Sequence, residues 1–186
     1  MSKLLSKATI ASVAIAATAM GIFYLTSASG DNNTVNNDNS PQATLVSVWD
    51  RETAPNYSGI ENMTVYRSPS CGCCGVWIEH ARKHGFKIED IKTEEMTAIK
   101  QQHNIPAELT SCHTTIIDGY VMEGHIPADD IKRFLAQKPK DLIGLTVPGM
   151  PIGTPGMEAQ DIKQPFQVLA FNNKGETQVF NEYQSY

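Results

Sequence analysis

The sequence predicts an α/β domain in which strands and helices follow one another in the order β-α-β-α-β-β-α. Three observations lead to this fold class. Short runs of β-branched and aromatic residues alternate with amphipathic segments that are bounded by Gly and Pro. An Asp-Gly pair between two of these runs is a strong hairpin signal. Hydrophobic residues make up 41% of the 186 residues, which is enough for one packed core.

The first half of this pattern consists of two strands and two helices. Residues 63–66, which are β-branched and aromatic, predict the first strand. The apolar spacing within residues 73–84 predicts a helix, and residues 86–91 alternate as a second strand. Residues 94–103 predict a second helix, with Thr93 as its N-cap.

The second half begins with a hairpin. Residues 114–117 and 120–123 predict two strands that are joined by a turn at Asp118-Gly119. A third helix is expected at residues 127–137, with Pro at its start and an apolar face. The whole order matches the thioredoxin arrangement.

Further elements flank this unit. Residues 45–49 alternate apolar and polar side chains and predict an edge strand. Residues 147–157 hold three Pro and three Gly, a composition that excludes regular structure. Residues 166–171 and 177–180, around the turn 172–175, predict a C-terminal β-hairpin.

The N-terminal segment predicts export. Lys3 and Lys7 form a short basic region before the uncharged, mostly apolar run of residues 8–25, and small residues follow up to Ala28, which is the order of a secretory signal. If this signal is not cleaved, residues 4–25 are expected to anchor the protein in a membrane. We therefore expect a signal peptide or anchor (1–28), a flexible Asn-rich linker (29–44) and a single metal-binding domain (45–186).

The charge of the chain argues against nucleic acid as a partner. The formal net charge is −5, and the sequence shows no cluster of Lys and Arg. Nucleic-acid-binding domains instead carry basic patches.

The cysteines are the strongest chemical signal. Cys71, Cys73 and Cys74 lie within four residues at a strand-to-helix junction, and Cys112 comes directly before the third strand. Amides at a helix N-terminus stabilise thiolates, which attack disulfides and also bind Cu(I) or zinc. Two structural disulfides, for example from Cys112 to one motif cysteine, are the plainer interpretation.

The loop before the third strand favours metal binding. In thioredoxin-like folds this loop faces the C-x-x-C motif and carries a cis-proline. Residues 107–126 offer no proline there and carry Cys112-His113 instead. Two metal-binding residue types therefore occupy the position where a thiol substrate is normally received.

Three segments together resemble one known family. TVYRSPSCGCCGVWIEHARKHGF, ELTSCHTTIIDGYVMEGHIPADDIKRFLA and GLTVPGMPIGTPGME are similar to the CopG proteins of bacterial copper-resistance operons. The resemblance spans about residues 63–171. It implies a periplasmic, thioredoxin-like protein that holds a cysteine-bridged, redox-active, multinuclear copper cluster in which Cu(I) is favoured.

Other soft and nitrogen ligands are expected near the cysteines. His113 adjoins Cys112, and His125 follows the fourth strand. Met150 and Met157 lie in the Pro/Gly loop without core periodicity, and a thioether suits Cu(I). Three more histidines are interpreted as exposed helix residues, namely His80, His84 and His103.

Four functions compete at this point. The first is a copper-binding protein that serves copper resistance. Such a protein could be an enzyme, a copper oxidoreductase that interconverts Cu(I) and Cu(II). Its partners would be copper ions and other periplasmic copper-handling or redox proteins. The second is a thiol-disulfide oxidoreductase that uses Cys71 and Cys74. A [2Fe–2S] carrier and a structural zinc site are the remaining two.

Overall fold

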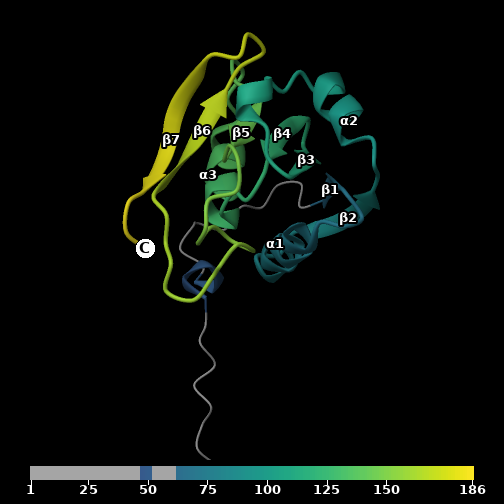
Figure 1. Cartoon of the computed structure of the whole chain (residues 1–186). Coiled ribbons are helices and arrows are strands. Elements are labelled where there is room, and N and C mark those ends of the chain that lie inside the picture. The colour runs from purple at the N-terminus through teal and green to yellow at the C-terminus, as the bar shows by residue number, and fades with distance from the viewer. Residues whose placement is uncertain (1–46, 52–61) are drawn as a thin grey trace, which may run out of the picture. The chain divides into compact units, whose positions relative to one another are not determined.

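The computed structural model describes residues 47–51 and 62–186, and a single mixed sheet lies at the centre of the latter range. Its strands are β1 (Asn62–Arg67), β2 (Lys87–Lys92), β3 (His113–Ile117), β4 (Tyr120–Glu123), β5 (Gly144–Thr146), β6 (Phe166–Phe171) and β7 (Thr177–Tyr183). The α-helices are α1 (Gly72–Lys83), α2 (Met96–Gln102) and α3 (Ala128–Gln137), and two short 3-10 helices are η1 (Val48–Asp50) and η2 (Ala107–Leu109) (Figure 1).

The order of the strands confirms the thioredoxin-like fold. Across the sheet the strands run β2-β1-β3-β4-β5-β6-β7, with β1–β2 and β4–β5 parallel and the other neighbours antiparallel. The predicted hairpin turn is present, because Asp118 and Gly119 both have positive φ, at 49° and 80°. The C-terminal hairpin of β6 and β7 extends the sheet on the far side of β5.

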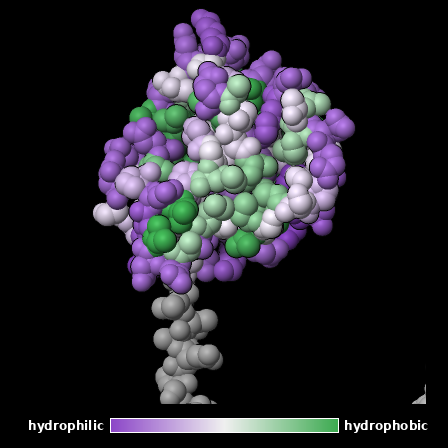
Figure 2. All heavy atoms as spheres, viewed as in Figure 1, coloured by the Kyte–Doolittle hydropathy of each residue, from purple (hydrophilic) through white to green (hydrophobic). Residues whose placement is uncertain are grey.

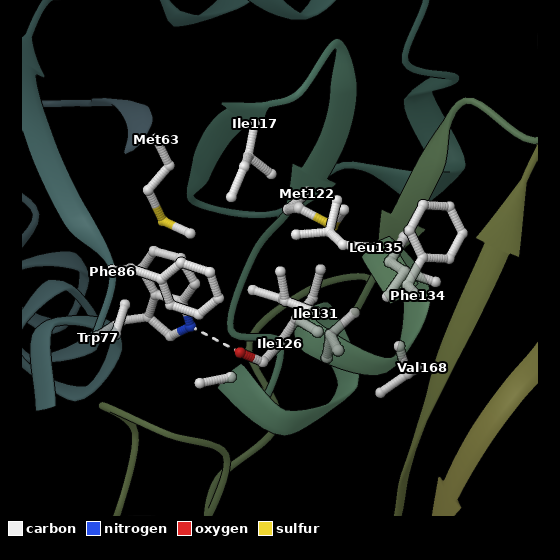
Figure 3. Packing of buried hydrophobic residues seen from close by; sticks show 14 of the residues in the cluster. Met63, Trp77, Phe86, Ile117, Met122, Ile126, Ile131, Phe134, Leu135 and Val168 are labelled. Carbon is white, nitrogen blue, oxygen red and sulfur yellow. Dashed lines mark hydrogen bonds between the residues drawn. The ribbon is translucent and has the colours of Figure 1, made fainter. Parts of the chain in front are cut away.

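Two hydrophobic clusters cover opposite faces of the sheet. Ile117 belongs to the larger cluster and Ile116 to the smaller one, as expected for neighbours on one strand. α1 and α3 place Trp77 and Phe134 in the larger cluster (Figure 3), whereas α2 buries no residue. The indole nitrogen of Trp77 donates a hydrogen bond of 2.9 Å to the Ile126 carbonyl, which ties α1 to the segment after β4.

The predicted edge strand at 45–49 is wrong over its described part. Residues 48–50 form the 3-10 helix η1, because the Ser47 hydroxyl accepts a hydrogen bond from the Trp49 amide. Such a local side-chain bond competes with strand pairing. Trp49 is buried, and its indole donates to the Gly153 carbonyl at 2.8 Å, so this segment packs on the Pro/Gly loop.

Two details of the other elements also differ from the prediction. The N-cap of α2 is Glu95, and the Thr93 hydroxyl accepts from the Glu95 amide at 3.0 Å in the turn before it. The sequence pattern missed β5, which has only three residues. Gly144 is required there, because a Cβ at this position would overlap the Val121 carbonyl of β4.

Residues 1–28, predicted as a signal or anchor, and residues 29–44, predicted as a linker, lie outside the described residues. In the part of the chain that is described, every helix is too short or too polar to cross a membrane.

Candidate metal centre

The first half of the site lies at the start of α1. Cys71 is the N-cap residue, so the three motif sulfurs come from the first turn of the helix. Cys71 and Cys74 form a disulfide with their Cα atoms 5.4 Å apart, and Cys73 is a free thiol. The sulfur of Cys73 lies 3.6 Å from that of Cys71, and Cys74 is fully buried.

The second half comes from β3 and the segment after β4. Cys112, also a free thiol, brings its sulfur to 3.0 Å from His125 Nε2 and 3.4 Å from His113 Nδ1. All four sulfurs lie within 4.8 Å of one another, and so do the donor atoms of Cys112, His113 and His125. Cys112 is therefore common to both groups, and the alternative of a structural disulfide through this residue is not seen in this structure.

The orientation of His125 is fixed by the Pro/Gly loop. Its Nδ1–H donates a hydrogen bond of 2.7 Å to the Pro155 carbonyl, because a carbonyl can only accept. The lone pair of the neutral ring is therefore on Nε2, which faces the Cys112 sulfur. A backbone carbonyl on the second nitrogen is the usual partner of a metal-binding histidine.

Burial keeps both imidazoles neutral. It holds the pKa of His113 well below its usual range, and it also lowers that of His125. The ring of His113 packs on Trp77 with centroids 4.5 Å apart, and its Nε2 makes no hydrogen bond to any described residue. Both rings can thus offer a lone pair to a metal without first losing a proton.

The Cys112 thiol is protonated when no metal is present. Burial is the largest cause, and with the neighbouring Cys73 it raises the pKa of Cys112 to about 12. A metal that binds this sulfur must displace the proton, so loading releases acid and is favoured as the pH rises.

The loop of residues 147–157 closes over the motif. Gly156 has a φ of +80°, and a Cβ there would lie 2.7 Å from Trp77 N and 2.9 Å from Cys73 O. On the other side, the amide of Gly149 donates to the Thr110 carbonyl at 3.0 Å, next to the Cys112 loop. The loop therefore bridges the two halves of the site.

These two glycines make a matched pair of variants. Gly149 also has a positive φ, +70°, but a Cβ there would meet nothing within 4 Å. Each change to Ala costs about 1–2 kcal/mol for the left-handed backbone. We expect Gly156→Ala to cost about 1–3 kcal/mol more, because its methyl also meets the α1 backbone. Urea unfolding of the two variants measures this difference, and equal costs would show that the loop does not press on α1.

Glu123, which was not predicted as a functional residue, anchors the Cys112 loop. Its buried carboxylate accepts from the Ser111 amide at 2.6 Å and the Thr114 hydroxyl at 2.7 Å, and it also pairs with Lys100. Burial raises the pKa of Glu123, while Lys100 and these donors oppose the shift. The sequence signal for this role is the position of Glu123, a charged residue at the end of the otherwise apolar strand β4.

The two predicted thioethers lie in the loop with different exposure. Met150 is 54% exposed, and Met157 is half-buried. On the face shown in Figure 2, moderately apolar residues lie in the middle, with hydrophilic residues and a few strongly hydrophobic ones around them. A ligand role for Met150 and Met157 stays a prediction.

Two histidines expected on the surface are instead buried. His80 and His84, at the other end of α1, are 6% and 7% exposed. They are covered because His80 accepts from the Ala128 amide and His84 donates to the Trp49 carbonyl. His103 is half-buried at the C-cap of α2.

Comparisons with known proteins agree with this geometry. Residues 109–157 match the family described as "Protein of unknown function, DUF411". The solved structure "Copper resistance protein copG- Form 2" is 42% identical with a TM-score of 0.63, over 66% of this chain and 97% of that one. Form 1 is 40% identical with a TM-score of 0.64, over 68% and 100%. The chain belongs to the CopG family of copper resistance proteins. A search of curated proteins gave no match.

Membership of the CopG family agrees with the cluster that the structure assembles. Four sulfurs and two imidazoles converge from α1, β3 and the segment after β4, and such a set of donors can bind a metal ion. In the described form, the Cys71–Cys74 disulfide leaves two of the four sulfurs as thiols. Reduction of this bond must precede binding by all four thiolates.

Proposed function

We propose that the protein binds copper in a cysteine-bridged, multinuclear cluster and serves copper resistance by changing the oxidation state of the metal. The observation that carries this proposal is the convergence of four sulfurs within 4.8 Å of one another. The neutral imidazoles of His113 and His125 lie beside the Cys112 sulfur. The ligands are Cys71, Cys73, Cys74 and Cys112, with His113 and His125 as nitrogen donors.

The two kinds of donor suit the two oxidation states of copper. Thiolates stabilise Cu(I), whereas imidazole also accepts Cu(II). Cys112 would hold copper on the sulfur side, and His125 Nε2, which already faces this sulfur, would supply the nitrogen donor that Cu(II) accepts. Because both imidazoles are neutral, the change needs no proton transfer at the rings.

The first experiment follows the copper during redox cycling. Protein loaded with Cu(I) is titrated with ferricyanide and then with ascorbate, while EPR follows Cu(II) and metal analysis follows total copper. We expect a Cu(II) signal that appears and disappears with constant total copper. Loss of all copper on oxidation, with formation of the disulfide, would contradict the redox role and leave a Cu(I) store.

A thiol-disulfide oxidoreductase is the second candidate, because Cys71 and Cys74 are disulfide-bonded at the start of α1. An insulin-reduction assay of the metal-free, reduced protein distinguishes it. We expect the unmodified chain to reduce insulin about as slowly as the Cys71→Ser variant, because Cys112 and the Pro/Gly loop crowd the motif. Vigorous reduction of insulin by the unmodified chain would favour this candidate.

The compartment that we propose is the periplasm, on the basis of the basic and apolar N-terminal sequence. N-terminal sequencing of the exported protein should find a start near residue 29. An intact Met1 in the membrane fraction would show that residues 4–25 are an anchor.

A further inference from the structure

The far end of α1 carries a second cluster of titratable groups, away from the sulfurs. His80 and His84 are one helical turn apart, and their ring centroids are 4.6 Å from each other. Both line a cavity of about 360 Å³, together with Trp49, Asp129 and Tyr183. His80 lies six residues after Cys74, which is about 9 Å along a helix axis. The proposed copper cluster does not use these groups.

The hydrogen bonds of His84 leave one nitrogen available. Its Nε2–H donates to the Trp49 carbonyl at 2.7 Å, so the lone pair of the neutral ring is on Nδ1. This Nδ1 makes no hydrogen bond to any described residue, and Asp129 Oδ1 lies 3.4 Å away. A histidine whose other nitrogen donates to a backbone carbonyl has the arrangement common among metal ligands.

The distance between these two atoms fits a shared ion as well as a long ion pair. A charge-assisted hydrogen bond between an imidazolium and a carboxylate is about 2.7–2.9 Å long. Two ligands at about 2.0–2.1 Å from a tetrahedral ion are about 3.4 Å apart. The observed separation of 3.4 Å matches the second geometry.

His80 offers a proton instead of a lone pair. Its Nε2 accepts from the Ala128 amide at 3.1 Å, so the neutral ring carries its hydrogen on Nδ1. Burial, with the nearby His84, lowers the pKa of His80 to about 3, which keeps this ring neutral. The Nδ1–H is buried without a hydrogen bond to the described residues. It can donate to a water or anion bound to the same ion.

The cavity is lined by charges of both signs, because Arg51 and Arg133 line it together with Asp129. Lys83 pairs with Asp50 at 2.9 Å, and Arg133 pairs with Asp130. Asp50 and Asp129 both stabilise positive charge at His80. Nitrogen and oxygen donors without a thiolate suit Cu(II) or Zn(II) better than Cu(I).

We propose that His84 Nδ1 and Asp129 Oδ1 bind a divalent ion, Cu(II) or Zn(II), and that His80 Nδ1–H donates to an exogenous ligand of that ion. This second site goes beyond the proposed copper cluster, and neither depends on the other. The competing explanation of the same residues is an internal ion pair between protonated His84 and Asp129.

The test uses Zn(II), which is redox-inactive, and reads the histidine ring nitrogens directly. The full chain with all four cysteines changed to Ser is titrated with Zn(II), and ¹⁵N NMR follows each imidazole. We expect the Nδ1 resonance of His84 to shift with one equivalent. His80→Gln should weaken binding by about 10- to 100-fold, as for the loss of a supporting hydrogen bond. His84→Gln and Asp129→Asn should each weaken it more, and His103→Gln is the matched control.

The outcomes separate the proposal from the ion pair. If the four-serine chain does not fold, the same titration is done on the native chain loaded with Cu(I), in which the thiolates are occupied. If the ¹⁵N resonances show a doubly protonated His84 and excess Zn(II) does not shift them, the proposal is overturned in favour of the ion pair. Equal affinity in His84→Gln would also overturn it. A negative result leaves the copper content of the sulfur cluster as a separate question.

Discussion

Replacing Cys112 by Ser is expected to remove more than one copper ion from the loaded protein. The sulfur of Cys112 belongs both to the four-sulfur group and to the group with His113 and His125. In a cysteine-bridged cluster such a sulfur contacts two ions, and a hydroxyl is a poor ligand for Cu(I). Metal analysis after anaerobic loading with Cu(I) measures the loss. Cys71→Ser and Cys74→Ser should also lower the copper content.

Two comparisons make this result specific. Ser70→Ala changes an exposed residue beside the motif without removing a sulfur, and it should leave the copper content unchanged. Cys73→Ser tests the half of the site at the start of α1, because the sulfur of Cys73 lies close to that of Cys71. Full copper content in Cys112→Ser would show that the loop before β3 does not complete the site.

Changing Glu123 to Gln is expected to destabilise the fold and to release the Cys112 loop. The Glu123 side chain is fully buried, and the Lys100 side chain is 13% exposed. Removal of one partner of a buried ion pair typically costs about 3–5 kcal/mol, because the other charge stays buried. The Ser111 amide also loses a charged acceptor. Urea unfolding measures the cost, and the rate of thiol labelling at Cys112 reports on the loop.

A second variant separates the charge from the anchoring bonds. In Glu123→Gln with Lys100→Met no charge is left unpaired, so part of the stability should return. Labelling of Cys112 should stay faster than in the unmodified chain, because the bond to the Ser111 amide is still weakened. If the double variant restores slow labelling, Glu123 acts only as the partner of Lys100.

The fold was largely predictable from local patterns. The strands β1 to β4 and the three helices follow from β-branched runs, helical periodicity and the Asp118-Gly119 turn. The short strand β5 and the 3-10 helix η1 could not be found in this way. The first is defined by its pairing with β4, and the second by the hydrogen bond that the Trp49 amide donates to the Ser47 hydroxyl and by the burial of Trp49.

The site was predictable in its residue types but not in its orientations. The cysteine spacing and the position of the loop before β3 were sufficient to predict that Cys112 lies beside Cys71, Cys73 and Cys74. The direction of His125 depends on the Pro155 carbonyl, thirty residues away in sequence. The burial of His80 and His84 depends on α3 and η1, so helical periodicity alone placed them on the surface.

The aromatic contacts of Trp49 have a consequence for the order in which the chain folds. Its ring packs on Phe166, Tyr183 and Tyr186, with centroids 5.0 to 6.0 Å apart. These partners lie more than a hundred residues later, so a ribosome has made nearly the whole domain before Trp49 can be covered. Contacts between such distant residues carry a large loop-closure cost and form late. We expect Trp49 fluorescence to report the last step of refolding, after the sheet has formed.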